Sequence, residues 1–399
     1  MSTFPEEKIN TVQLFSTMAE RGVDMSEALL AQAAAPFDYK KLPLWGIEKA
    51  AKLAKTTSAT IRRLEKAGEL PQAKRDDINR RVYSLQDVNR IRARTGSLFK
   101  RPPGSLPLRC VVANLKGGTG KTTTAVHLAQ YAALQGLNVL LVDLDPQAST
   151  TNAFGLLPDI HVATQGTLAE PLVVEKLDEA RQLARNTIKQ TYWHQLDLIP
   201  SQLNMVSVDG ELTNKDGRDR IYRLRDILED LEQDYDLVVV DVPPALGLLS
   251  VSAMVAADYL LVPIVPNMPD IASSIQYFTI LSDVAEHMTL TDMNIMIARH
   301  EPSRHSDAAA ALIRSIYGIN VINAQMLATR ELSKSSHDLL SVYEIDKPTG
   351  SRDTYKRALS SMNAVNGEIL TRFQGIWEQQ TESVQKKTNQ GTTEIAANG

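Results

Sequence analysis

A glycine-rich segment with two lysines carries the clearest chemical signal in this chain, and it reads Lys116-Gly117-Gly118-Thr119-Gly120-Lys121-Thr122-Thr123. An apolar run over residues 110–115 precedes it, and a run with helical character over residues 125–134 follows it. A strand, a glycine loop and a helix in this order form the context that a phosphate-binding loop needs. The glycines let backbone N–H groups converge on phosphate oxygens, and the helix N-terminus adds positive potential. The segment therefore predicts a nucleotide-binding loop.

The two lysines of this loop predict two different roles. Lys121 is placed to reach the β- and γ-phosphates, and the Thr122 hydroxyl is placed to bind Mg²⁺. The common spacing would require glycine at position 115, where this chain has Leu115, and Lys116 is added at the start of the loop. One nucleotide does not need two lysines around one loop. We expect Lys121 to bind its own ATP or ADP and Lys116 to reach the phosphates of a partner subunit, so that ATP joins a face-to-face homodimer.

Two further apolar runs end in carboxylates: residues 139–145 end in Asp143 and Asp145, and residues 237–241 end in Asp241. Runs of this kind suit parallel strands covered on both faces, and open α/β sheets bind ligands at the carboxyl ends of such strands. We expect Asp241 to hold Mg²⁺, directly or through water, because hard cations take oxygen ligands. Asp145 is expected to orient the attacking water. Asp143 is expected to lie next to the metal site and to contact the metal's ligands rather than the ion itself. Each aspartate taken alone would fit a helix cap or a polar strand end equally well.

These motifs resemble the deviant Walker A ATPases, in particular the ParA plasmid-partition branch. The segments KGGTGKTTT, VDLDPQAST and DLVVVDVPPALG, with LLVPIVP downstream, carry a resemblance that covers about residues 108–375. By it, Lys116 matches the signature lysine, Lys121 the P-loop lysine, Asp145 the hydrolysis-linked aspartate and Asp241 the Walker B position. The resemblance implies an ATP-sandwich homodimer, weak ATP hydrolysis, non-specific DNA binding in the ATP state, and a ParB-type centromere-binding partner that stimulates hydrolysis.

The remaining pattern predicts the fold class. Strand-like runs alternate with helical ones, which indicates an α/β domain with a doubly wound, mainly parallel sheet over residues 108–379. Residues 298–302 follow one of these strands, at the place where related ATPases contact the base. The single cysteine, Cys110, lies in the first strand and cannot form a disulfide within the chain.

Charge is distributed unevenly along the chain. The net charge is −4 overall, but residues 45–101 hold 15 Lys+Arg against 6 Asp+Glu, which gives +9 there and −13 elsewhere. A basic block beside an acidic remainder indicates that the block contacts nucleic acid.

The basic block also has the order of a DNA-reading domain. A short helix over residues 46–54, a turn, and a second helix with Ser58 as N-cap and Gly68 as stop are followed by a wing-like excursion and a third helix from Ser84. The segment resembles the winged helix-turn-helix of the MerR-like kind, which places a DNA-binding domain at residues 41–101. By this resemblance the residues that meet bases or phosphates are Thr60, Arg62, Arg63, Arg80 and Arg81. The alternative is a solvated basic helical hairpin, whose DNA binding would be blind to sequence.

The two ends of the chain and the linker carry no chemical motif and predict only local structure. Residues 1–40 form an N-terminal helical segment, with apolar residues at near-helical spacing and a break around residues 22–24, and they serve either as a dimer contact or to pack on the winged domain. Residues 102–107 read as a linker, and the polar residues 380–399 as a disordered tail.

Two arginines match sites that the ParA branch uses for non-specific DNA binding. Arg352 lies in a segment similar to the family's Ser-Arg-Gly sequence, although Asp353 replaces the glycine, and Arg330 resembles a second such site. A solvated helix face is the alternative reading of both.

Three function classes fit these observations. The first is a plasmid-partition ATPase that also represses its own operator, with a cytoplasmic, nucleoid-associated location. The second is a nucleotide-sensing transcriptional regulator without a transport role. The third is a MinD-like membrane-cycling ATPase, a branch that ends in a short basic amphipathic helix, whereas this chain ends in a polar tail. The chain also has no apolar run of about 18 residues, so no transmembrane helix is expected. We therefore expect no membrane partner.

Overall fold

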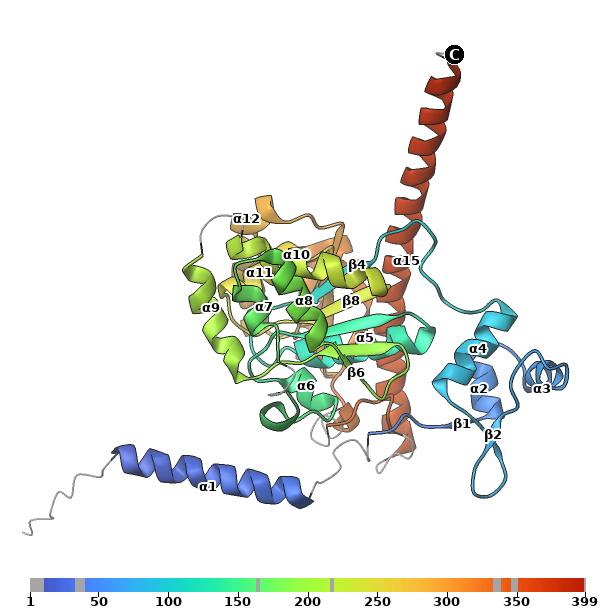
Figure 1. Ribbon diagram of the computed structural model, residues 1–399, viewed down its shortest axis with the longest axis horizontal. Helices are drawn as coiled ribbons and strands as arrows, with labels where there is room; N and C mark the ends of the chain where they lie inside the picture. Colours follow the sequence, from blue (N-terminus) through green and yellow to red (C-terminus); the bar gives the residue numbers. More distant parts are fainter. Residues whose placement is uncertain are drawn as a thin grey trace, which may run out of the picture. The chain divides into compact units, whose positions relative to one another are not determined.

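The computed structural model of the chain describes residues 11–32, 40–162, 166–215, 219–332, 339–345 and 351–397. The chain divides into two compact units, residues 1–41 and 42–399. In the first unit, α1 runs without interruption over Thr11–Gln32 (Figure 1), so the break expected around residues 22–24 does not occur. One glycine costs a helix interior only about 1 kcal/mol, which 22 residues of helix can absorb. Residues 1–10 and 33–39 of the predicted N-terminal segment lie outside the described residues.

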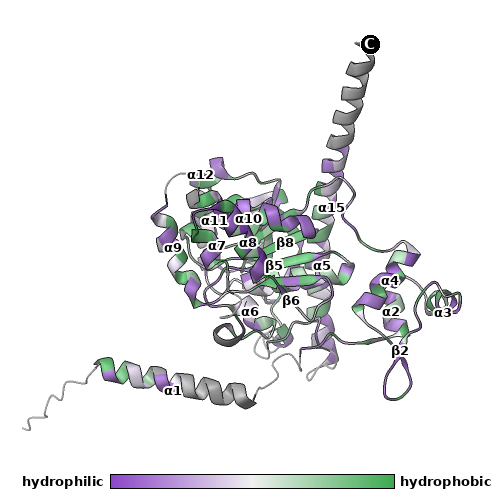
Figure 2. Cartoon of the chain, viewed as in Figure 1, coloured by the Kyte–Doolittle hydropathy of each residue, from purple (hydrophilic) through white to green (hydrophobic). Residues whose placement is uncertain are grey.

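An eight-stranded sheet forms the centre of the second unit (Figure 1), in the order β11-β10-β9-β4-β8-β5-β7-β6. All neighbours pair in parallel except β6 and β7, which are antiparallel. The strands are β4 (Leu108–Val112), β5 (Val139–Asp143), β6 (Lys189–Gln190), β7 (Leu196–Ile199), β8 (Leu237–Asp241), β9 (Tyr259–Ile264), β10 (Asp292–His300) and β11 (Val321–Leu327). Figure 2 shows the hydrophobic character of β5 and β8, as expected of strands covered on both faces. The predicted mainly parallel P-loop fold is confirmed.

Helices cover both faces of this sheet. Alternate strand residues point to opposite faces, so Val112 packs in the core on the α5 and α15 side while Val111 packs with α10 and α11. The helices are α5 (Lys121–Gln135), α6 (Ser149–Ala153), α7 (Ala169–Val173), α8 (Leu177–Thr187), α9 (Val206–Thr213), α10 (Asp219–Leu231), α11 (Leu248–Ala256), α12 (Met268–Val284), α13 (Arg304–Tyr317) and α15 (Arg352–Ala397).

The last helix is longer than the sequence suggests. Its apolar residues, including Ile369, Phe373 and Trp377, are buried against the sheet, and Trp377 Nε1–H donates to the carbonyl of Leu106 at 3.0 Å. The helix then continues to Ala397, through the polar residues that were expected to be disordered. Because nucleation is the costly step of helix formation, a helix anchored by packing extends into adjacent polar residues.

The winged domain precedes the sheet and consists of β1 (Trp45–Gly46), α2 (Ile47–Leu53), α3 (Ser58–Lys66), β2 (Lys74–Arg75), β3 (Arg81–Tyr83) and α4 (Leu85–Thr95). Its three strands pair antiparallel in the order β1-β3-β2. The N-cap of α3 is Thr57, whose Oγ1 accepts the N–H of Thr60 at 3.1 Å, and not Ser58 as predicted. Adjacent hydroxyl residues are both good N-caps, so composition does not decide between them. Gly68, with φ at +74°, ends the helix as expected.

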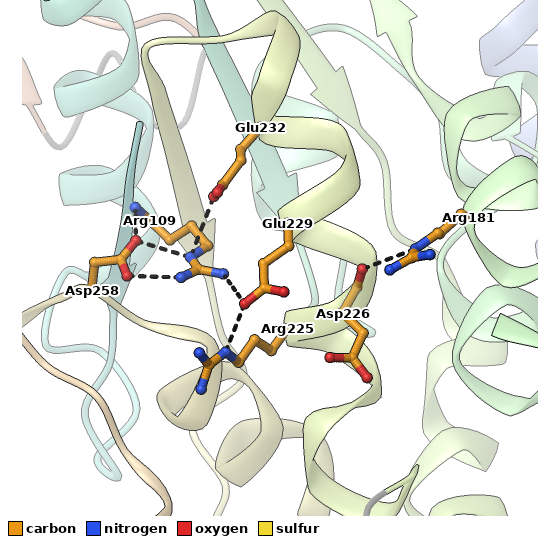
Figure 3. A network of polar contacts seen from close by, with 7 residues as sticks. All are labelled: Arg109, Arg181, Arg225, Asp226, Glu229, Glu232 and Asp258. Carbon is orange, nitrogen blue, oxygen red and sulfur yellow. Dashed lines mark hydrogen bonds and ion pairs between the residues drawn. The ribbon is translucent and has the colours of Figure 1, made fainter. Parts of the chain in front are cut away.

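A buried ion-pair network lies at the start of β4, at the end of the sheet opposite the strand C-termini (Figure 3). The Arg109 guanidinium donates to Asp258 at 2.9 and 2.8 Å and lies 3.4 Å from oxygens of both Glu229 and Glu232. Desolvation raises the pKa of Glu232 from 4.5 to about 7; the charges of Asp258 and Glu229 act in the same direction, and Arg109 opposes them. Three carboxylates therefore share one arginine.

We expect Glu232→Gln to stabilise the protein by about 1 kcal/mol at pH 8 and to have little effect at pH 5. Because the pKa of Glu232 is higher in the folded than in the unfolded state, this carboxyl group lowers the free energy of unfolding as pH rises from 4.5 to about 7. A neutral amide removes that penalty.

Urea denaturation at both pH values measures this difference. Glu211→Gln, on the exposed face of α9, is the matched control and should change little at either pH. A Glu232→Gln protein that is less stable than wild type at pH 8 would contradict the raised pKa.

Candidate functional site

The predicted nucleotide loop connects β4 to α5 at the carboxyl end of the sheet. Gly118 and Gly120 have φ angles of +73° and +90°, which side chains rarely adopt, and a Cβ at Gly120 would lie 3.1 Å from Met326 Cε. These two positions therefore require glycine. Gly120 is also the N-cap of α5, so the first N–H groups of that helix face the loop.

Lys121 is the first residue of α5 and is only 6% exposed. Its Nζ donates to the carbonyl of Lys116 at 3.1 Å, which folds the side chain back over the loop. Burial lowers the pKa of Lys121, while the charges of Asp241 and Asp145 act in the opposite direction. Two carboxylates thus partly offset the effect of burial on the pKa of the Lys121 ammonium group.

Asp143 and Asp241 end adjacent strands and are paired in register, so the sequence prediction that they lie together is supported by the geometry. Oδ2 of Asp143 accepts both the N–H and the hydroxyl of Thr151, at 2.8 and 2.7 Å. Oδ1 of Asp143 accepts the N–H of Asp145 at 3.1 Å, which fixes the turn that carries Asp145. Burial raises the pKa of Asp143, and the neighbouring charge of Asp241 raises it further.

Asp241 has the features of a cation ligand. Its Oδ2 accepts the hydroxyl of Thr150 at 2.8 Å, whereas its Oδ1 is buried and has no hydrogen-bond partner among the residues that the structure describes. Burial also raises the pKa of this carboxyl group, and the hydroxyl groups of Thr150 and Thr122 oppose that effect. An unpartnered buried carboxylate oxygen beside a threonine hydroxyl fits Mg²⁺, which is held by one or two carboxylates together with substrate phosphates and water.

Asp145 lies in front of this pair and is 8% exposed. Its Oδ1 accepts the N–H of Gln147 at 2.9 Å, and its carbonyl accepts the N–H of Ala148 at 2.8 Å. The carboxylate is thereby held toward the adjacent cavity, which Asp145 lines.

A cavity of about 730 Å³ lies beside the loop and is large enough for a nucleotide. It collects most of the predicted loop residues, whereas Thr119, Asp143 and Asp241 are buried behind it and Lys116 is not part of its lining. The lining residues include Gly117, Gly118, Gly120, Lys121, Thr122, Thr123, Asp145, Arg299, Glu301 and Arg330. Arg299 and Glu301 belong to the segment expected to contact the base.

Lys116 is placed differently from Lys121. Its Nζ forms a close ion pair with Asp270, in the first turn of α12, and its side chain is 38% exposed. The two lysines therefore differ in location: Lys121 is buried beside the cavity, whereas Lys116 is partly exposed and paired with α12.

Several site residues were missed or undervalued by sequence reasoning. Arg299, at the end of β10, has a left-handed φ of +51° and donates to the carbonyl of Gly118 at 2.8 Å. Thr150, Thr151 and Asp270 make the contacts described above. Arg299 lies within residues 298–302, which the resemblance to related ATPases placed near the base, and Thr150 ends the motif VDLDPQAST, but neither residue was given a role of its own. Thr151 and Asp270 carried no sequence signal.

The predicted DNA-reading residues lie on α3 and on the wing. Arg62 and Arg63 are exposed on α3, and Thr60 is half-buried with its hydroxyl 2.9 Å from that of Thr57. Arg80 is exposed at the wing turn and pairs with Asp76 at 3.0 Å. Arg81 lies 3.5 Å from the buried carboxylate of Glu65 and is 33% exposed, so it is partly engaged in structure.

The two arginines predicted for non-specific DNA binding lie in different places. Arg330 lines the nucleotide cavity, whereas Arg352 is the exposed first residue of α15. Residues 333–338 and 346–350 beside them lie outside the described residues. Over the described ranges, no helix combines the length and the apolar character needed to cross a bilayer.

Comparisons with known proteins agree with this geometry. Residues 109–297 match the family described as AAA domain, and residues 46–94 match the MerR HTH family regulatory proteins. The chain is 33% identical over 370 residues to a protein of Rhizobium rhizogenes named as a replication protein A, covering 87% of this chain and 90% of that protein. It is 34% identical over 347 residues to protein SopA of Escherichia coli strain K12, covering 82% of this chain and 88% of SopA.

A shorter match, 36% identical over 153 residues, relates the chain to the chromosome partitioning protein ParA of Myxococcus xanthus, over 38% of this chain and 50% of ParA. A solved structure named Partition Protein shares the fold, with a TM-score of 0.59 and 20% identity, and covers 80% of this chain and 96% of that one. Because relatives at 33% and 34% identity match over most of their length and the nucleotide loop and its aspartates are assembled, the chain belongs to the ParA-type family of partition ATPases and carries an N-terminal MerR-type helix-turn-helix.

Proposed function

We propose that this chain drives the active partition of a low-copy plasmid and also represses its own operator. The observation that carries the proposal is the presence, on one chain, of a loop with Lys116 and Lys121 beside Asp145 and of a basic winged domain. An ATP-dependent homodimer coats nucleoid DNA, and a ParB-type protein at the plasmid centromere stimulates hydrolysis and releases it locally. The winged domain supplies the sequence-specific operator contact.

Within the nucleotide site, the residues of this chain have separate tasks. Backbone N–H groups of the loop cradle the phosphates, and Lys121 neutralises their charge. Thr122 and Asp241 would hold Mg²⁺, which supplies positive charge at the phosphates when bound. Asp145 orients the attacking water, and Lys116 of the partner copy adds charge across the dimer. Positioning and charge stabilisation are the main contributions of a protein to phosphoryl transfer.

Two DNA-binding modes follow from two separate surfaces. Exposed Arg62 and Arg63 on α3 serve the operator, whereas Arg352 and Arg330 of the ATPase domain serve DNA of any sequence. Arginine suits both tasks because its planar guanidinium bonds phosphate and guanine in a forked geometry.

DNA binding by the purified protein with ATP, with ADP and without nucleotide tests this proposal, on random DNA and on the promoter region of its own gene. ATP-favoured binding to random DNA together with ADP-favoured binding to the promoter supports the two roles. Promoter binding that is indifferent to nucleotide, with no ATP-dependent binding to random DNA, favours a plain transcriptional regulator instead.

Arg352→Ala should weaken ATP-dependent binding to random DNA by about five- to tenfold, because one exposed phosphate contact is lost. Nucleotide affinity should stay unchanged, since Arg352 does not line the nucleotide cavity. Fluorescence anisotropy at several salt concentrations measures both the affinity and its salt dependence. Arg304→Ala, an exposed arginine at the first residue of α13, is the matched control. Equal DNA affinity for Arg352→Ala and wild type at every salt concentration would exclude this role.

Asp145→Ala should hold ATP but hydrolyse it about 100-fold more slowly, because the attacking water loses the group that orients it. Lys121→Ala provides the contrast, since it should lose nucleotide binding itself. Binding of a fluorescent ATP analogue and steady-state phosphate release separate the two effects. Wild-type turnover in Asp145→Ala would refute the role assigned to this carboxylate.

A further inference from the structure

Helix α5 connects the nucleotide loop directly to the winged domain. It begins at Lys121 in the loop and ends at Gln135, so its 15 residues span roughly 22 Å. Residues 124–130, 132 and 133 are buried, and the helix packs on α15 and on the strands β5 and β8. A helix this closely packed moves as a rod, because interiors resist local deformation.

Arg92 of α4 binds the C-terminal end of α5. Its guanidinium donates to the carbonyl of Leu134, in the last turn of α5, and to the carbonyl of Leu53 in α2 at 3.1 and 2.8 Å. The side chain is 3% exposed, and its charge suits the partial negative charge at the C-terminal ends of both helices. One arginine thus joins the nucleotide-binding helix to the first helix of the DNA-reading pair.

Asn89 and Gln195 form a second bridge beside it. The Asn89 amide donates to Gln195 Oε1 at 2.6 Å, and the Gln195 amide donates to the carbonyl of Gly136 at 3.0 Å, just after α5. Gln195 has a left-handed φ of +66°, a conformation that costs energy for most residues. The backbone is therefore strained at the residue that completes the bridge.

The segment that links the winged domain to the ATPase domain also packs against the end of α5. Gly136 has a φ of +111°, and a Cβ there would overlap the side chain of Leu98. The Phe99 ring lies 6.3 Å from that of Trp377, and Arg101 donates to Asp236 at 3.2 Å. The apolar core of the winged domain is continuous with the core on the α5 face of the sheet.

We propose that α5 carries the nucleotide state of the loop to the winged domain, and that Arg92 and the Asn89–Gln195 bridge are the positioning residues through which it changes operator affinity. Phosphates bind at the N-terminal end of the rod, and any displacement of its first turn reaches Leu134 and Gly136 at the other end. The proposal rests on the proposed operator function and names the residues that couple it to the nucleotide site.

Gln195→Asn tests the bridge from the ATPase side. Asparagine tolerates the left-handed conformation but is one methylene too short to span the gap. Asn89→Ala tests the same bridge from the winged domain, and Gln182→Asn on the exposed face of α8 is the matched control. The probes are ADP and a DNA fragment from the promoter region of the protein's own gene.

For the wild type and the control, ADP should change promoter affinity by about tenfold. In Gln195→Asn and in Asn89→Ala this ratio should fall to about threefold or less, while ADP affinity and promoter affinity without nucleotide stay within about twofold of wild type. An unchanged ratio in both variants overturns the proposal.

Hydrogen exchange of residues 85–95 separates this inference from the operator function. ADP should alter the exchange of these α4 amides in the wild type and alter it less in both variants. That result supports the coupling even if the promoter fragment is not bound, in which case only the operator proposal fails. Exchange in α4 that does not respond to ADP in the wild type overturns the coupling whatever the DNA result.

Discussion

The buried carboxylates Asp143 and Asp241 are the constraint on which this structure depends. They are 1% and 0% exposed on paired residues of β5 and β8, and burial raises the pKa of both. Buried charges without compensation are strongly destabilising. Here the compensating groups come from separate segments: the hydroxyls of Thr150 and Thr151 from α6, and the ammonium of Lys121 from the loop. The strand register, α6 and the loop must therefore all be in place before the site can exist.

The apolar residues of the strands, which identify the sheet in the sequence, also fix the register in which the strands pair. Successive residues of β5 and β8 pack into two different cores, so a shift by one residue would move every side chain to the wrong face and separate Asp143 from Asp241. The helix that follows the loop shares this rigidity. Because α5 is packed along its length, it fixes both the geometry of Lys121 and the position of the winged domain at its other end.

Local patterns were enough to predict the loop, the three aspartates and the parallel sheet, because each of these features depends on a few consecutive residues. The contacts that complete the site were not predictable in this way. Asp270 meets Lys116 across 154 positions of sequence, and Arg299 meets Gly118 across 181. Nor did composition reveal that the polar end of α15 would stay helical, since the reason lies in packing far upstream.

In the proposed dimer, the two lysines of one loop would act on two different nucleotides. Lys121 is buried beside Asp241 and Asp145 of its own chain, a position that suits the proposed contact with the nucleotide of its own subunit. Lys116 is partly exposed and pairs with Asp270, whose nearly buried carboxylate gains a compensating positive charge from this contact. To act on the phosphates of a second copy, Lys116 must exchange this carboxylate for phosphate. Breaking the Lys116–Asp270 ion pair costs little free energy only where a phosphate is present to replace the carboxylate. Closure of the proposed dimer should therefore depend on bound nucleotide.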